Sequence, residues 1–161
     1  MDDQAGNDLH VTHEIEHGHE AYTDEELFDQ ARLNAQALLL ATAHTLGGDA
    51  AALEAWTRGV ADIFLRAWDR EREWRAAEVL DALLTNYRSL GASVIAADLE
   101  ASPATATIAE LPEVGLVETL GLADADADAV FAIGAHLARA LGHELTWARD
   151  TETGDVRLAG T

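Results

Sequence analysis

The sequence contains no lysine and no cysteine in its 161 residues. Without lysine, the chain cannot form a Schiff base, use a lysine general base or build a lysine-dependent phosphate-binding loop. Without cysteine, it has no disulfide bonds, thiolate nucleophiles, or cysteine-ligated zinc or iron–sulfur centres. These two absences exclude several large classes of enzyme and redox protein.

Positive charge is also scarce, because ten arginines face 30 aspartates and glutamates and the formal net charge is −20. Nucleic acids and anionic membranes are held by cationic side chains that neutralise phosphates, so we expect neither as a partner. The acidic surplus is typical of a salt-adapted protein. A GC-rich genome would also replace lysine by arginine, but it would not explain the excess of carboxylates.

Long hydrophobic runs are missing as well. The first thirty residues have no apolar segment of the signal-peptide kind, and the longest apolar run is far shorter than a membrane span. We therefore expect a cytoplasmic protein. Apolar residues make up 48% of the chain, enough for the core of one domain. We place this domain at residues 23–161 and interpret residues 1–22, rich in His and acidic residues, as a mobile tail.

Three helices are predicted in the first half of the domain. Thr23 and Glu26 form a capping box that begins the first helix, and Gly47 ends it. Its apolar residues keep helical spacing at Phe28, Ala31, Ala35, Leu38, Leu39 and Leu46. Two further apolar stripes predict helices after Asp49 and up to Gly91. The segment between them, residues 69–73, has neither glycine nor proline, so one continuous helix remains an alternative.

The second half contains two predicted hairpins. Residues 93–97 and 104–108 form the first, and residues 144–149 and 156–159 form the second. Between them we expect a short helix starting at Pro112 and another over residues 124–142. The predicted fold is α+β, in the order ααα-ββ-αα-ββ, with helices packed on a four-stranded antiparallel sheet. A free strand edge in so small a sheet favours a homodimer.

Four of the seven histidines lie in the tail, where they suggest a metal site. His13 and His17 would lie one turn apart on a helix, and His19 is close by, so the group could chelate zinc or nickel. A solvated tail is the alternative, because ordering a flexible segment costs entropy. The segment also matches the H-E-x-x-H motif, but zinc proteases place that motif on a stable helix inside a fold.

A second acidic pattern, Asp124-x-Asp126-x-Asp128, resembles the start of a calcium-binding loop. Position six of that loop would be Ala129 where glycine is needed, and position twelve would be Ala135 where a bidentate glutamate is needed. The pattern instead predicts an acidic helix N-terminus that interacts favourably with the helix dipole.

A candidate ligand site lies near the end of the last predicted helix. His136, Arg139 and His143 share one helical face and Trp147 follows on the next strand, so the four could hold a carboxylate-bearing or aromatic ligand. Alternatively, Arg139 and His143 are simply cations at a helix C-terminus. We find no Ser-His-Asp arrangement and no nucleotide fingerprint, so the sequence offers no catalytic constellation.

Several short motifs resemble a known family. They are Leu111-Pro112, Gly121-Leu122 and Thr151-Glu152-Thr153-Gly154-Asp155. In their layout, residues 26–160 resemble L-2-amino-thiazoline-4-carboxylic acid hydrolase-like proteins and the related 4-vinyl-reductase small-molecule-binding domains. The resemblance implies a shared fold and a ligand pocket. Where the family typically has cysteine before the proline, this chain has Leu111, so it lacks the residues for cysteine-dependent hydrolysis.

We therefore predict a small-molecule-binding or regulatory domain that is non-catalytic and homodimeric, with its pocket between the helices and the sheet. One alternative is a hydrolase that uses histidine or carboxylate groups, assisted by a metal held in the tail. Another is a structural subunit that binds a protein partner.

Overall fold

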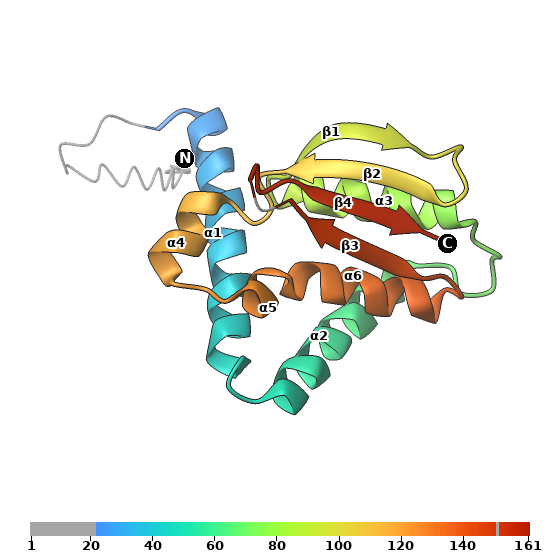
Figure 1. The fold of residues 1–161 in the computed structure, drawn as a ribbon, viewed down its shortest axis with the longest axis horizontal. Coiled ribbons are helices and arrows are strands. Elements are labelled where there is room, and N and C mark those ends of the chain that lie inside the picture. The colour runs from blue at the N-terminus through green and yellow to red at the C-terminus, as the bar shows by residue number, and fades with distance from the viewer. Residues whose placement is uncertain (1–21, 151) are drawn as a thin grey trace, which may run out of the picture.

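The computed structural model describes residues 22–150 and 152–161 and has an α+β fold, as predicted (Figure 1). The helices are α1 (Asp24–Leu46), α2 (Ala50–Phe64), the 3₁₀ turn η1 (Leu65–Ala67), α3 (Ala76–Ser89), α4 (Val114–Leu120), α5 (Asp124–Ala127) and α6 (Ala129–Ala140). The strands are β1 (Ser93–Asp98), β2 (Ala104–Ala109), β3 (Leu145–Arg149) and β4 (Val156–Gly160). None of the described helices is long and apolar enough to cross a membrane.

The two predicted hairpins form one antiparallel sheet in the order β1-β2-β4-β3. The two hairpins join where β2 pairs with β4, from Ala104 opposite Gly160 to Ile108 opposite Val156. Along β2 the side chains alternate: Ala106 and Ile108 are buried, whereas Thr105 and Thr107 are partly exposed. This period-two pattern gives the sheet one face toward the core and one face toward solvent.

The core lies between the buried face of the sheet and the helices α3 and α6. In Figure 1, α3 runs behind the sheet and α6 runs along β3. The largest fully buried side chains include Phe131 and Leu137 of α6, Leu80 of α3, and Ile108 and Leu158 of the sheet. Helix α2 packs on α6 from the side away from the sheet and forms an additional layer.

Helices α2 and α3 are separate. Helix α2 continues into η1, and an irregular segment then leads to α3. In this segment the Trp68 and Trp74 rings meet edge to face at 4.8 Å, and Trp74 Nε1 donates a hydrogen bond to the Asp69 carbonyl at 2.8 Å. A bend therefore forms without glycine or proline, because the two indoles and this hydrogen bond hold it.

The last predicted helix is also divided. Asp128 ends the short α5 and begins α6, so three helices lie between the hairpins where two were expected. Pro112 precedes the next helix and lies outside it, because Glu113 caps α4 by accepting hydrogen bonds from the amides of Gly115 and Leu116. These are corrections of helix boundaries, and the order of hairpins and helical segments is unchanged.

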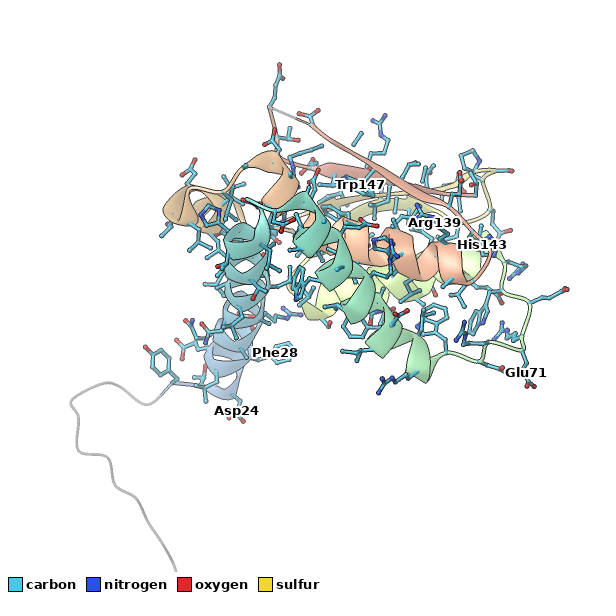
Figure 2. The ribbon with its side chains drawn as sticks, turned by 90° about the horizontal axis from the view of Figure 1, so that it is seen from below. Asp24, Phe28, Glu71, Arg139, His143 and Trp147 are labelled. Atoms are coloured by element: carbon cyan, nitrogen blue, oxygen red, sulfur yellow. The ribbon has the colours of Figure 1, made fainter. Side chains whose placement is uncertain are left out.

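Helix α1 has the predicted capping box, but only part of the expected apolar stripe faces the core, at Ala35, Leu39 and Leu46, which are partly buried. Phe28 and Leu38 are 58% and 72% exposed, whereas the buried residues are Gln36, Leu40 and Ala43. Phe28 is exposed because α1 extends past the rest of the molecule and this residue lies toward its free end (Figures 1 and 2). The spacing predicts the helix correctly, but it does not show which face has a partner.

Candidate functional site

An apolar pocket lies between α3 and α6. Each helix contributes a stripe spaced by three, four and seven residues, the spacing that places side chains on one helical face. The residues are Leu83, Asn86, Tyr87 and Leu90 from α3 and its end, and Val130, Ile133, Gly134 and Leu137 from α6. Leu39 of α1, Val60 and Phe64 of α2, and Ser89 complete the lining of a cavity of about 140 Å³. The lining of this pocket comes from helices and their ends and includes no residue of the sheet.

The chemistry of this pocket is almost entirely apolar. None of its lining residues is charged, and its polar side chains are those of Asn86, Ser89 and Tyr87. Asn86 and Ser89 are exposed, and Phe64 is 50% exposed, so these residues form a rim that reaches solvent. Such a lining favours an apolar ligand that can enter from the rim.

Tyr87 lines the pocket with an almost fully buried side chain. Its side chain is only 3% exposed, and its hydroxyl makes no hydrogen bond with any described residue. Its ring packs edge to face on Phe131, with the ring centroids 5.6 Å apart. Burial raises the pKa of the Tyr87 phenol well above its usual range, so the hydroxyl keeps its proton and remains a donor.

Gly134 leaves the space that the Tyr87 hydroxyl occupies. A β-carbon at position 134 would overlap the Tyr87 oxygen and come within 3.2 Å of Leu145 Cδ2. Glycine in a helix interior costs stability relative to alanine, and here the missing side chain makes room for the phenol. The sequence carried a signal for this contact, because an isolated glycine within an otherwise regular helix often marks a close packing contact.

Two of the four predicted ligand residues line a different hollow. His136 and Arg139 of α6 face Arg58 and Asp62 of α2 around a space of about 310 Å³. His136 Nε2 lies 3.4 Å from a carboxylate oxygen of Glu54. The pKa of Glu54 is lowered, chiefly by its hydrogen bond with Arg58 and to a smaller extent by His136. In this arrangement Glu54 contacts both Arg58, four residues further along α2, and His136 of α6.

The other two predicted residues make structural contacts. The His143 ring places Nε2 2.6 Å from the Trp74 carbonyl and Nδ1 3.2 Å from the Thr161 carbonyl. Trp147 donates from Nε1 to Asp128 at 3.0 Å and packs on Phe131. Arg139, His143 and Trp147 lie on α6, just beyond it and on β3, respectively (Figure 2). The structure does not bring the four residues into one pocket.

The aspartates of the Asp124-x-Asp126-x-Asp128 pattern do not form one site either. Asp126 is 6% exposed and lies 2.9 Å from His44 Nδ1, whereas Asp128 contacts β3. The two carboxylates thus have different partners and do not converge on an ion. Within residues 22–150 and 152–161 no group of three histidines and carboxylates is placed to hold a metal. The predicted metal ligands His13, His17 and His19 lie outside the described residues.

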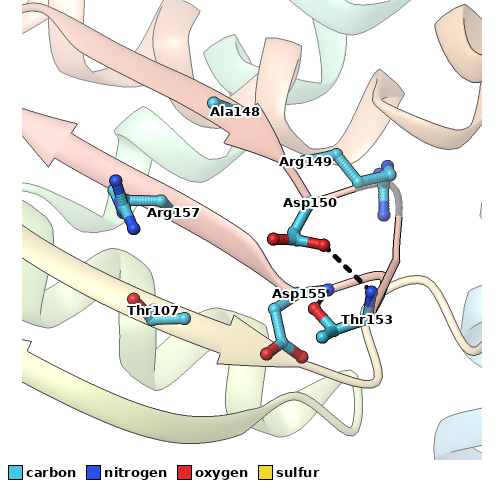
Figure 3. Close-up of a pocket in the computed structure, with 7 residues that line it drawn as sticks. All are labelled: Thr107, Ala148, Arg149, Asp150, Thr153, Asp155 and Arg157. Atoms are coloured by element: carbon cyan, nitrogen blue, oxygen red, sulfur yellow. Dashed lines mark hydrogen bonds between the residues drawn. The ribbon is translucent and has the colours of Figure 1, made fainter.

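A third hollow lies on the solvent face of the sheet and is shown in Figure 3. Arg157 lies between Thr107 and Ala148 of the neighbouring strands, beside the turn that carries Asp150 and Asp155, and the space measures about 300 Å³. Asp150 accepts hydrogen bonds from the amides of Thr153 and Glu152, which lower its pKa. The lining combines two arginines with two carboxylates, so it has no net preference for an anion or a cation.

Together, the fold and the apolar pocket define an α+β domain with an apolar pocket that is lined by helices and opens to solvent at its rim. Comparison of the chain with protein-family models, with curated proteins and with solved structures finds no match. The resemblance to hydrolase-like and vinyl-reductase-type domains therefore remains a prediction.

Proposed function

We propose that this chain is a small-molecule-binding domain of a salt-adapted cytoplasm, and that it binds its ligand in the pocket between α3 and α6. The observation that carries the proposal is an uncharged cavity of about 140 Å³ with an exposed rim. A dry apolar cavity of about 150 Å³ is large enough to hold benzene. The ligand is therefore a small ring or a short branched chain, or the end of a larger molecule that extends past the rim.

Hydrolysis has weaker support. The hollow beside His136 has a histidine near a carboxylate, which is a reasonable pair for proton transfer. However, the described residues around it include no serine, threonine or cysteine that could act as a nucleophile. His136 is also 3.4 Å from a Glu54 side chain that already bonds Arg58, so the pair is better explained as part of the packing of α2 on α6.

The homodimer is proposed on the free edge of β1. All six residues of β1 are exposed, including Ile95 at 60%, and β1 is an outer strand of the sheet. An outer strand presents unpaired backbone groups that a second copy can satisfy. Light scattering should give twice the chain mass for the native protein and the single-chain mass for Ile95→Lys. A native monomer would refute the dimer.

Ligand binding can be tested with fluorobenzene as the probe, followed by fluorine NMR and by thermal unfolding. Binding should shift or broaden the fluorine signal and raise the unfolding temperature as the probe concentration rises. Leu39→Phe should abolish both effects, because the larger ring fills the pocket. Leu38→Phe is the matched control, since Leu38 is 72% exposed and does not line the pocket. The proposal fails if the native protein does not bind, or if Leu39→Phe binds as well as the native protein.

A further inference from the structure

We infer that the dimer interface proposed at β1 continues into the hollow between β1 and α3, where Arg88 of each copy forms an ion pair with Asp81 of the other copy. This inference rests on the proposed homodimer and adds the residues by which one copy recognises the second. The hollow is then complete only when two copies meet.

The first observation is an uncovered strip of the sheet beneath its free edge. Val94 and Ala97 of β1 pair with buried residues of β2, and residues paired across two strands point to the same face. Val94 and Ala97 therefore point to the side of the helices, where α3 runs behind the sheet (Figure 1). Both are nevertheless exposed, and a hollow of about 580 Å³ lies between β1 and α3. A second copy at the edge would cover this strip.

The second observation is a pair of opposite charges on the helical wall of the hollow. Asp81, Thr85 and Arg88 share one face of α3, and all three are exposed. Seven residues of helix separate Asp81 from Arg88 by about 10 Å along the axis. Neither side chain forms an ion pair with a described residue.

The two other charged residues of the lining have partners within the chain. Arg32 Nη1 lies 3.4 Å from a carboxylate oxygen of Asp29. The carboxylate of Glu110 accepts a hydrogen bond from the Ser93 hydroxyl. The charges left for a second copy are therefore the two on α3.

The third observation is that this face of α3 is complementary to itself. Antiparallel pairing of β1 with β1 of a second copy places a two-fold axis perpendicular to the sheet, which reverses one α3 relative to the other. The short turn from α3 to β1 sets Arg88 near the start of the strand and Asp81 near its end. With the axis at the middle of β1, Thr85 faces Thr85 of the second copy, and Arg88 lies opposite Asp81 on both sides of the axis.

The length of the arginine side chain suits the gap between the two helices. Helix α3 packs beneath β4, β2 and β1, so three strand spacings, about 14 Å, separate the two α3 helices, whereas directly packed helices lie about 8–10 Å apart. The hollows of both copies merge in this gap. A long guanidinium side chain from one helix crosses it to a short carboxylate on the other.

The ion pairs also select one register of the two strands. Shifting the pairing of the β1 strands by two residues would move the second copy by about 7 Å and separate both pairs. Complementary charges across an interface fix its register in this way and disfavour wrong pairings. Two copies that each carry a net charge of −20 repel each other, so these attractions also offset part of the repulsion.

The first test reverses each charge separately. Asp81→Arg places arginine against Arg88 in both pairs, and Arg88→Asp places aspartate against Asp81 in both. Each variant should dimerise at least about tenfold more weakly than the native protein in sedimentation equilibrium. Glu118→Arg and Arg66→Asp are the matched controls, because they change the charge equally at exposed positions outside the hollow, and their dimers should dissociate no more readily than the native dimer.

The second test mixes the two variants in equal amounts. A heterodimer of Asp81→Arg with Arg88→Asp has arginine against aspartate in both pairs, so it regains the attraction that each homodimer lacks. Native mass spectrometry, with one variant labelled with heavy nitrogen, should show the heterodimer in clear excess over both homodimers. The mixture of the two control variants should give close to the statistical ratio.

The outcomes separate this inference from the proposed dimer. If Ile95→Lys dissociates the native dimer but neither charge reversal weakens it, the inference about α3 is wrong while the dimer through β1 stands. If both reversals weaken the dimer but their mixture forms no excess of heterodimer, the inference is also wrong, because the effect then does not come from a specific pair. A native monomer overturns the dimer and this inference together.

Discussion

Asp128 accepts a hydrogen bond from the indole Nε1 of Trp147 at 3.0 Å, and so ties the start of α6 to β3. Its second oxygen accepts from Arg149 on the same strand at 2.5 Å. All three side chains are partly buried, which makes these hydrogen bonds stronger than those of an exposed ion pair. One carboxylate thus orients two residues of β3 over the core.

Replacing this carboxylate should destabilise the fold. We expect Asp128→Ala to lower the free energy of unfolding by about 2 to 3 kcal/mol, because it leaves a partly buried guanidinium and an indole N–H without their acceptor. The measurement is urea unfolding followed by tryptophan fluorescence. Asp124→Ala is the control, since Asp124 is exposed and its substitution should change stability by less than about 1 kcal/mol. Equal effects of the two substitutions would show that Asp128 stabilises only as an N-terminal charge.

For the acidic repeat at Asp124, Asp126 and Asp128, the local pattern predicts the start of a helix but not the tertiary contacts of the carboxylates. Its spacing and position correctly predict the start of a helix at Asp124 and argue against a calcium loop. The partners of Asp126 and Asp128 are His44 and Trp147, which are distant in sequence, and nothing in the local pattern points to them. Short-range signals such as caps and turns were therefore predictable, whereas tertiary pairs of polar residues were not.

Gln36 is a second buried polar residue with long-range contacts. It is 4% exposed, and its amide donates to the carbonyls of Leu90 at 2.7 Å and Glu110 at 3.2 Å. Its own oxygen accepts from the Glu113 amide at 2.9 Å. One side chain therefore joins α1 to the end of α3, the end of β2 and the start of α4. The helical pattern alone gave no reason to expect a buried glutamine here.

Gln36→Leu should keep the volume of the side chain but leave these three backbone groups without a partner. We expect the free energy of unfolding to fall by at least about 2 kcal/mol, since each buried unsatisfied group carries a penalty. Gln30→Leu on the same helix is the matched control, because Gln30 is exposed and bonds only Asn34 among the described residues. The measurement is chemical unfolding of both variants. If Gln36→Leu lowers the free energy of unfolding only slightly, water takes the place of the amide as the partner of these backbone groups.

The pocket was harder to predict than the fold. Short β-compatible runs separated by turn residues predicted all four strands, because these signals are local. Tyr87 and Gly134 belong to two helices that meet only in the tertiary structure, so the local pattern around either residue did not point to the other. Conversely, the spacing of His136, Arg139 and His143 suggested a shared site, but the ring nitrogens of His143 lie beside the Trp74 and Thr161 carbonyls instead.

Glu78 should contribute to the pH dependence of stability. The Arg75 amide donates to its carboxylate at 2.9 Å and, with the nearby guanidinium of Arg72, lowers the pKa of Glu78 below its ordinary value. A carboxyl with a lowered pKa stabilises the fold at pH values above its unfolded pKa of about 4.3. This contribution is lost as the pH falls through the folded-state pKa.

Glu78→Gln cannot titrate, so its stability should fall less steeply than that of the native protein between about pH 5 and pH 3. Thermal unfolding across this range gives the comparison. Glu73→Gln is the control, because Glu73 is exposed and has no ion pair with a described residue. Parallel curves for the native protein and Glu78→Gln would mean that this carboxylate does not gain its hydrogen bonds on folding.

The large negative charge should make stability depend on salt. With 30 carboxylates against ten arginines, folding brings like charges together. The range of these interactions falls from about 10 Å at 0.1 M salt to about 3 Å at 1 M, so repulsion between exposed carboxylates fades. We expect the unfolding temperature to rise steadily from dilute buffer to molar potassium chloride. Exposed pairs such as Arg58 with Glu54 weaken over the same range, but ten arginines can pair with only a minority of the 30 carboxylates, so we expect the trend to hold.

The control for salt adaptation is a variant in which several exposed carboxylates that do not line the pocket become amides. Asp29, Asp62 and Glu118 are exposed, and Asp29→Asn, Asp62→Asn and Glu118→Gln together lower the repulsion without altering the core. The triple variant should be more stable than the native protein in dilute buffer and should gain less from added salt. If the native protein is insensitive to salt, the absence of lysine reflects the composition of the genome, and the acidic surface is not an adaptation to a salty cytoplasm.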